Sequence, residues 1–111
     1  MKPLLSSLRE KKRYVAFKAI TTEPLAFKSI RKSIQEHFLN LAGEKGYAKA
    51  GIMILPEQWD KNKHLGILKV NHLWLYDLKM ALALVKNIDG EKVILQSIGV
   101  SGILDKAKQY R

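Results

Sequence analysis

Apolar and polar residues alternate in four short stretches of this chain, and a repeat of two residues is typical of β-strands. The stretches cover residues 13–21, 47–55, 64–71 and 92–98. In the first stretch, Val15, Phe17 and Ala19 fall on one face, which suits a buried core. Tyr14 and Lys18 fall on the opposite face, which suits contact with water. We therefore predict four strands, with the first placing one face against a core.

Two longer segments repeat their apolar residues every three or four positions, as amphipathic helices do. Residues 24–42 carry a stripe of Ala26, Ile30, Ile34, Phe38 and Leu41, and residues 72–88 carry one of Leu75, Leu78, Leu82 and Val85. Pro24 suits a first helical turn, and Gly43 and Gly46 are expected to end the first helix. Asp89 and Gly90 predict a turn after the second helix.

The predicted elements follow one another as β-α-β-β-α-β, the order of the ferredoxin-like and RRM-like folds. We expect an α+β two-layer sandwich in a single domain, residues 1–111, with both helices on one face of an antiparallel sheet. The other face would carry Tyr14, Lys18, Lys69 and Gln96. Residues 1–12 would form a basic arm. A turn over residues 99–103, with Ser101 as N-cap, would lead into a short C-terminal helix.

The chain is strongly basic. It has 20 lysine and arginine residues against 10 aspartate and glutamate residues, a net charge of +10. Residues 1–18 contain six of these cations and one acidic residue. Such a charge on a small domain favours a polyanionic partner, either a nucleic acid or an anionic membrane, although a basic arm is also compatible with a solvated tail. The absence of cysteine suits a reducing cytoplasm.

The residues that catalysis needs do not form a recognisable group. His37, His64 and His72 are not spaced like metal ligands with a carboxylate or with one another. The sequence contains neither a glycine-rich phosphate loop nor a nucleophile elbow, and its carboxylates do not form a catalytic pair. We therefore expect that the chain binds no metal or other cofactor and catalyses no reaction by itself.

An RRM reads single-stranded RNA with aromatic residues in its first and third strands. Tyr14 is the only aromatic on the outer face of these two strands, because Phe17 faces the core and the third strand offers Ile67 and Lys69. Contacts from lysine and arginine to phosphates should therefore dominate. The candidate RNA-binding residues are Arg9, Lys11, Lys12, Arg13, Tyr14, Lys18, Lys69, Lys106 and Lys108.

The second predicted helix is apolar on more sides than one sheet contact requires. Leu73, Trp74, Tyr76 and Met80 lie outside its core stripe. We predict that these four residues contact a protein partner. The alternative is that the arm or the C-terminal helix covers them.

Four stretches carry a resemblance to a known family, in the same order along the chain. They are residues 8–17, 66–69, 81–85 and 99–104. Together with the lengths of the intervening elements, they resemble archaeal ribonuclease P protein component 2 over nearly the whole chain. The first and last stretches are specific in combination.

The resemblance implies a non-catalytic subunit of ribonuclease P, the ribonucleoprotein that removes the 5′ leader from precursor tRNA. Its catalyst is RNA, and Mg²⁺ belongs to the RNA subunit rather than to the protein. The implied partners are ribonuclease P RNA and ribonuclease P protein component 3, with precursor tRNA contacted indirectly, no membrane, and a homodimer of this chain inside a heterotetramer. Lysine and arginine would lower the repulsion between closely packed phosphates.

Two other readings of the same fold remain. One is a protein-interaction or small-molecule-sensing module that binds no RNA, and the cations clustered at the N-terminus argue against it. The other is an acylphosphatase-like enzyme, which would need a glycine-rich loop and an arginine after the first strand. Thr21, Thr22, Glu23 and Pro24 stand there instead.

Overall fold

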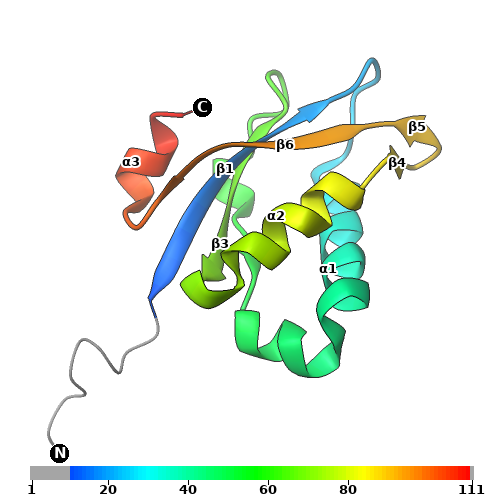
Figure 1. Cartoon of the computed structure of the whole chain (residues 1–111). Helices are drawn as coiled ribbons and strands as arrows, with labels where there is room; N and C mark the ends of the chain where they lie inside the picture. The colour runs from blue at the N-terminus through cyan, green and yellow to red at the C-terminus, as the bar shows by residue number, and fades with distance from the viewer. Residues whose placement is uncertain (1–10, 111) are drawn as a thin grey trace, which may run out of the picture.

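The computed structural model describes residues 11–110, in which strands and helices alternate (Figure 1). The strands are β1 (Lys12–Ile20), β2 (Met53–Ile54), β3 (Leu65–Asn71), β4 (Asn87–Ile88), β5 (Glu91–Lys92) and β6 (Ile94–Ser101). The helices are α1 (Phe27–Ala50), α2 (Leu75–Leu84) and α3 (Leu104–Lys108), with single 3₁₀ turns at η2 (Pro56–Gln58) and η3 (His72–Trp74). A basic residue, Lys12, begins the first strand.

The main sheet has four antiparallel strands in the order β2-β3-β1-β6. Both long helices, α1 and α2, lie on one face of it (Figure 1). This arrangement confirms the expected ferredoxin-like sandwich. The short strands β4 and β5 form a separate hairpin, which turns at Asp89 and Gly90 with positive φ angles of 53° and 82°. The turn predicted at that dipeptide is therefore confirmed.

The core lies between the sheet and the two helices. Val15, Phe17 and Ala19 of β1 are almost fully buried there, as the two-residue repeat predicts. Most of the expected helical stripes also lie in this cluster, namely Ile30, Ile34, Phe38, Leu78, Leu82 and Val85. The predicted burial is wrong for Ala26 and Leu41, because both are exposed. Ala26 is the extended N-cap residue of α1, and Leu41 lies just before a kink in that helix.

The glycines of α1 do not end the helix. Gly43 adopts non-helical angles (φ 75°, ψ 171°) and kinks α1, which then continues to Ala50. Gly51 ends it in the left-handed region, and its N–H donates to the carbonyl of Tyr47 at 3.3 Å. The strand predicted over residues 47–55 is consequently wrong in its first half. Only Met53–Ile54 pairs with β3.

Position 46 requires a glycine because an aromatic ring covers it. A Cβ at this position would lie 2.8 Å from Cη2 of Trp74, which stands just before α2. The ring of Trp74 also meets Phe38 nearly edge-on, with 6.3 Å between the ring centroids. The glycine thus permits close packing between the second half of α1 and the start of α2.

The second helix is shorter than the predicted segment of residues 72–88. It begins with η3, runs as α2 to Leu84, and ends before the strand β4. Asn71 caps its start, because the Asn71 side chain accepts the N–H of Leu73 at 3.0 Å. The polar residue at the end of β3 therefore starts the helical segment.

The strand β6 continues into the turn predicted over residues 99–103 and ends at Ser101. It contains a bulge, since Ser97 pairs with Phe17 and Gly99 pairs with Ala16, which leaves Ile98 as the additional residue. The chain turns only after Ser101, whose hydroxyl accepts the N–H of Ile103 at 3.1 Å. Ser101 therefore stabilises the turn and is not the N-cap of α3, which is Ile103.

Candidate nucleic-acid interface and partner surface

Several of the candidate basic residues share the face of the sheet that lies opposite α1 and α2. Tyr14 of β1 is directly opposite Lys69 of β3 and Ser101 of β6. Lys18 is opposite Gln96. Directly opposite residues of antiparallel strands point to the same side. The sheet therefore gathers Tyr14, Lys18, Lys69 and Gln96 on one face, as predicted.

The helix α3 covers the middle of this face. Ala107 is fully buried in a second cluster with Ala16, Ile67 and Leu55. Tyr14, Ile98 and Leu104 pack at its edge. The face is therefore not the open aromatic platform of an RRM, because a short helix occupies its centre and Tyr14 contributes to the contact.

The same helix brings two further candidate cations to this side of the protein. Lys106 is exposed, and Lys108 forms an ion pair of 3.8 Å with Asp105. An exposed pair of this kind contributes little to stability and leaves the ammonium accessible. The interface thus combines cations from β1, β3 and α3.

The start of β1 is attached to two distant parts of the chain. The guanidinium of Arg13 donates through Nη1 to the carbonyl of Lys12 at 3.1 Å. It also lies beside Gly102, where a Cβ would be 3.4 Å from Nη1. The ammonium of Lys12 lies beside Gly51, at the C-terminal end of α1 where a cation is favourable. Both cations therefore have a structural role that the sequence did not reveal.

The remaining two candidates in the arm are Lys11 and Arg9. Lys11 is exposed at the beginning of β1. Its carbonyl accepts the N–H of His72 at 2.8 Å, which connects the arm to the start of η3. Arg9 lies outside the described residues.

A basic loop at the other end of the sheet, residues 60–63, adds cations that are outside the predicted set. The Asp60 carboxylate accepts the N–H groups of Asn62 (2.9 Å) and Lys63 (3.1 Å), which closes a tight turn. This turn leaves Lys61 and Lys63 exposed. The N–H of Ala19 donates to the carbonyl of His64 at 2.9 Å, so the loop stands next to the end of β1 and near Lys18. The Asp-Lys-Asn-Lys sequence of residues 60–63 is the feature that could have predicted an exposed basic turn here.

Trp59 precedes that loop and folds back onto the domain. Its ring lies 6.2 Å from that of Phe17 and 5.9 Å from that of Phe27, measured between centroids. His64 lies on its other side at 6.1 Å. The indole therefore packs against the domain, beside three aromatic neighbours.

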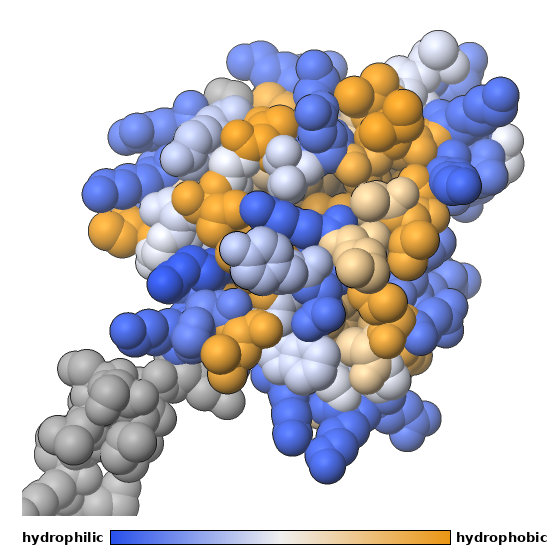
Figure 2. All heavy atoms as spheres, in the orientation of Figure 1, coloured by the Kyte–Doolittle hydropathy of each residue, from blue (hydrophilic) through white to orange (hydrophobic). Residues whose placement is uncertain are grey.

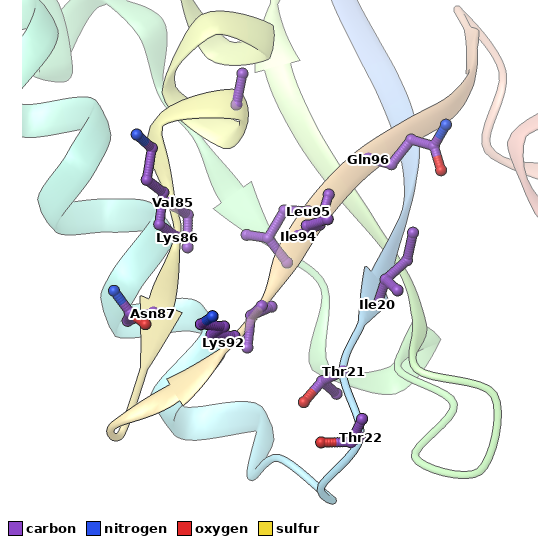
Figure 3. Close-up of a pocket in the computed structure, with 12 residues that line it drawn as sticks. Ile20, Thr21, Thr22, Val85, Lys86, Asn87, Lys92, Ile94, Leu95 and Gln96 are labelled. Carbon is purple, nitrogen blue, oxygen red and sulfur yellow. The ribbon is translucent and has the colours of Figure 1, made fainter.

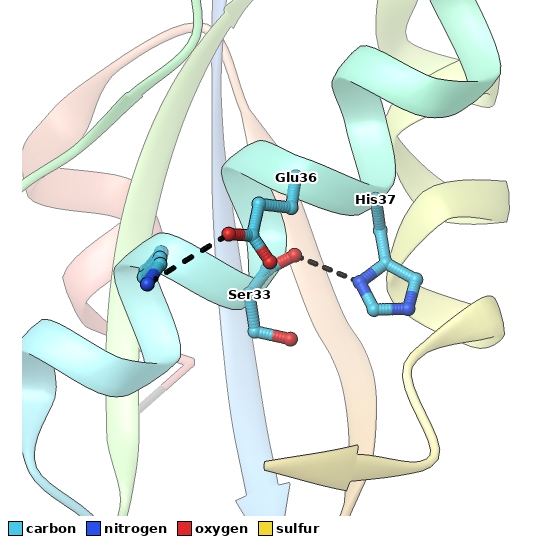
Figure 4. Close-up of polar contacts among 4 residues, drawn as sticks. Ser33, Glu36 and His37 are labelled. Carbon is cyan, nitrogen blue, oxygen red and sulfur yellow. Dashed lines mark hydrogen bonds and ion pairs between the residues drawn. The ribbon is translucent and has the colours of Figure 1, made fainter. Parts of the chain in front are cut away.

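The polar groups of α1 make local contacts. His37 donates through Nδ1 to the carbonyl of Ser33 at 2.8 Å, and Lys32 is 4.0 Å from the carboxylate of Glu36 (Figure 4). Among residues 11–110, no three histidine, aspartate or glutamate side chains are grouped so that they could hold a metal ion. None of the helices in this range is both long and apolar enough to pass through a bilayer.

The predicted partner residues fall into two groups. Leu73, Tyr76 and Met80 are exposed, with 74%, 81% and 55% of their surface accessible. Their spacing places them along the outer side of the η3–α2 segment, a region where Figure 2 shows apolar side chains. Trp74 instead packs against Phe38 and Gly46. We define the outer apolar stripe as Leu73, Tyr76 and Met80.

Comparison with known proteins gives a consistent result. The model of the Rpp14/Pop5 family matches residues 13–111. Ribonuclease P protein component 2 of Pyrococcus furiosus is 35% identical over 108 residues, which cover 97% of this chain and 88% of the relative. The proteins of the same name from Thermococcus gammatolerans and Methanosarcina mazei are 36% and 33% identical, over 97% and 98% of this chain and 88% and 90% of theirs.

A solved structure has the same fold. A chain in the cryo-EM structure of yeast ribonuclease MRP aligns with 92% of this chain and 86% of its own length, with a TM-score of 0.65. Its sequence is 11% identical. The likeness therefore supports the α+β architecture.

Proposed function

The chain belongs to the Rpp14/Pop5 family and is a protein subunit of ribonuclease P, and we propose that it acts there by binding the catalytic RNA. The observation that carries this proposal is the convergence of cations from β1, β3 and α3 on one side of the molecule. No metal-binding cluster lies among residues 11–110. As the resemblance implies, we assign the chemistry of leader removal from precursor tRNA to the RNA and its Mg²⁺.

The physical role of this basic side is charge neutralisation. A folded RNA brings phosphates close together, and each lysine or arginine that contacts a phosphate releases condensed counterions. Lys18, Lys69 and Lys106 lie on a frame of paired strands and a packed helix, so the backbone that carries them needs no ordering when they bind. Tyr14 is half-buried against the α3 cluster, which ranks it below the cations as an RNA contact.

The outer apolar stripe would serve a protein partner. Exposed apolar side chains in a row are typical of helix surfaces that bind other proteins. We assign Leu73, Tyr76 and Met80 to ribonuclease P protein component 3, with Trp74 supporting the stripe from beneath. Assembly as a homodimer within a heterotetramer, indirect contact with precursor tRNA and a cytoplasmic location complete the proposal.

The test compares two sets of three lysines. Replacing Lys18, Lys69 and Lys106 by alanine removes three charges from the proposed interface. Replacing Lys28, Lys45 and Lys49 by alanine removes three charges from exposed positions of α1. Filter binding to ribonuclease P RNA is measured over a range of salt concentrations for both variants.

We expect the first variant to lower the slope of log affinity against log salt by about two to three units, because each lost phosphate contact removes roughly 0.7–0.9. The second variant should change it by less than about one unit. Equal losses in the two variants would mean that the affinity follows net charge alone. No loss in the first variant would remove the proposed interface.

A further inference from the structure

A groove with a volume of about 1060 Å³ opens beside the beginning of β6 (Figure 3). Its walls come from the end of β1, from the segment around the end of α2 and from β6 itself. The apolar lining consists of Ile20, Ala83, Val85, Val93, Ile94 and Leu95. Among the described residues that line the groove, Lys86 and Lys92 are charged and none is acidic.

The strand β6 is an edge of the sheet, and its first four residues, 94–97, lie between the Val93–Lys86 hydrogen bond and the bulge at Ile98 without protection of their own. It pairs with β1 on one side, and no other strand of residues 11–110 pairs with its outer side. Its eight residues include neither a charged residue nor a proline, although 27% of the chain is charged. Natural proteins usually protect an edge with charges, prolines or a very short strand. The opposite edge is protected in this way, since β2 has two residues and Pro56 follows closely.

The groove takes residues from both faces of the sheet at this edge. Leu95 belongs to the cluster under α1 and α2, together with Val85. Ile94 points to the opposite face, where it is directly across from Ile20, and both are exposed. A strand added to β6 would send its alternate side chains to these two faces. The two-sided lining therefore fits an extended segment that lies along β6.

We propose that the edge of β6 binds an extended segment of another protein, apolar at alternate positions and flanked by acidic residues. The main chain of this segment would pair with β6, and its apolar side chains would fill the groove. Lys86 and Lys92 at the rim would meet its acidic ends. This site lies at the far end of β1 from the arm, and it does not depend on the proposed RNA interface.

Two other occupants fit the same surface less well. A second copy of this chain would present its own β6, which has no acidic residue to meet Lys86 and Lys92. RNA offers phosphates to the lysines, but nothing in its backbone matches an apolar lining. Charge and shape together therefore favour a protein segment.

The test selects peptides of about 12 residues, enough for one strand with flanks, from a random display library on the full-length protein. Fluorescence anisotropy then measures the Kd of the enriched peptides. We expect these to alternate apolar and polar residues and to carry aspartate or glutamate at their ends. Binding should slow amide hydrogen exchange in β6, most strongly at residues 94–97, which precede the bulge.

Two pairs of variants locate the site. Ile94→Asp places a charge on the apolar lining and should weaken binding by about tenfold or more. Met53→Asp is its control, because Met53 is similarly exposed (53% against 62%) on the opposite edge strand. Lys92→Glu should weaken binding by about threefold or more, while Lys49→Glu on α1 should leave it unchanged.

Several outcomes would overturn the proposal. These are a failure to enrich any peptide, enriched peptides with helical spacing, and peptides that bind Ile94→Asp as well as the wild type. Sedimentation that shows a dimer of the full chain, abolished by Ile94→Asp, would identify a second copy as the occupant. Slowed exchange of β6 on addition of ribonuclease P RNA alone would identify the RNA.

Discussion

Replacing Gly99 by alanine should displace the ring of Tyr110 and loosen α3 from the sheet. A Cβ at Gly99 would overlap the ring atoms of Tyr110, which follows α3 in the sequence. Gly99 stands directly across from Ala16, which lies under the buried Ala107. The methyl group would therefore act at the point where the helix meets the sheet.

The magnitude follows from the area that the ring buries. Tyr110 is 48% exposed, so it buries about half of the roughly 150–250 Å² that an aromatic side chain can bury. At about 25 cal/mol per Å², complete loss of this contact would cost about 2–3 kcal/mol. The ring can move aside and keep part of the contact, so we expect a cost of about 2 kcal/mol, which falls in the usual range for overpacking. For a domain of this size, Tm should fall by about 8 °C.

Thermal unfolding of four proteins tests the cause of this loss. The wild type and Gly99→Ala give the cost, and the same pair in a Tyr110→Ala background gives the cost when the ring is absent. A double-mutant cycle should then recover most of the loss as coupling between the two positions. Gly102→Ala is the control, since a Cβ there would lie 3.4 Å from Arg13 Nη1 and should change stability by no more than about 0.5 kcal/mol.

Two results would refute the reasoning. If Gly99→Ala costs the same with and without the Tyr110 ring, the ring is not what requires the glycine. If it costs nothing in the wild type, α3 does not depend on this contact. In the expected case the variant should also bind ribonuclease P RNA more weakly, because Lys106 and Lys108 are carried by α3.

Three further predictions concern helix packing, the arm and catalysis. Gly46→Ala should cost about 1–3 kcal/mol in chemical denaturation, because the new methyl would crowd the Trp74 ring at 2.8 Å, and a neutral result would contradict this packing. Replacing Arg9, Lys11, Lys12 and Arg13 by alanine should weaken RNA binding and reduce its salt dependence in filter binding; wild-type activation of the RNA at the same salt would make the arm a solvated tail. Purified protein with Mg²⁺ should leave precursor tRNA intact in a gel assay, and cleavage that a single substitution abolishes would refute this.

The parts of the fold that the sequence predicts are those fixed by local periodicity. The alternation in β1 and β3 and the stripe from Ile30 to Phe38 each repeat over several residues. The repeat correctly assigns Val15, Phe17, Leu68 and Val70 to the core under the helices, but Ala16 and Ile67 on the opposite face are buried as well, because α3 covers them. Asp89 and Gly90 adopt positive φ angles that few other pairs tolerate. The order of these elements along the chain then predicts the topology of the sheet.

Two of the wrong predictions concern glycines that are required by an aromatic ring distant in the sequence. Gly46 and Gly99 were interpreted as breaks in the chain, yet one lies inside α1 and the other inside β6. Position 46 requires glycine because the ring of Trp74 lies on it, and position 99 requires glycine because the ring of Tyr110 lies on it. Nothing near either glycine in the sequence indicates which ring will cover it. The first half of the strand predicted over residues 47–55 is wrong because α1 continues past Gly46 to Ala50.

The sequence predicts which face of the sheet carries the candidate cations, but it does not predict the helix that covers the centre of this face. Alternation along β1 and β3 placed Lys18 and Lys69 on one face, and the pairing agrees. The position of α3 over that face could not be predicted, because its contacts come from small residues such as Ala16 and Ala107. The basic loop at Lys61 and Lys63 lies beside β1 through the Ala19–His64 backbone hydrogen bond and leads directly into β3, a position that its own residues do not indicate.

The contacts of Arg13 connect the two ends of the chain and change what the arm variant measures. Its guanidinium donates to the carbonyl of Lys12 and lies beside Gly102 in the turn before α3. Only one of the five N–H donors of an arginine is used in that bond, so an oriented fork remains for a phosphate. Such preorganisation lowers the entropy that RNA binding would otherwise cost. We therefore expect Arg13→Ala to remove both a charge and an oriented fork of donors from the proposed RNA interface. A single Arg13→Lys variant separates the two effects: it keeps the charge, and a loss of RNA affinity would then report the lost orientation.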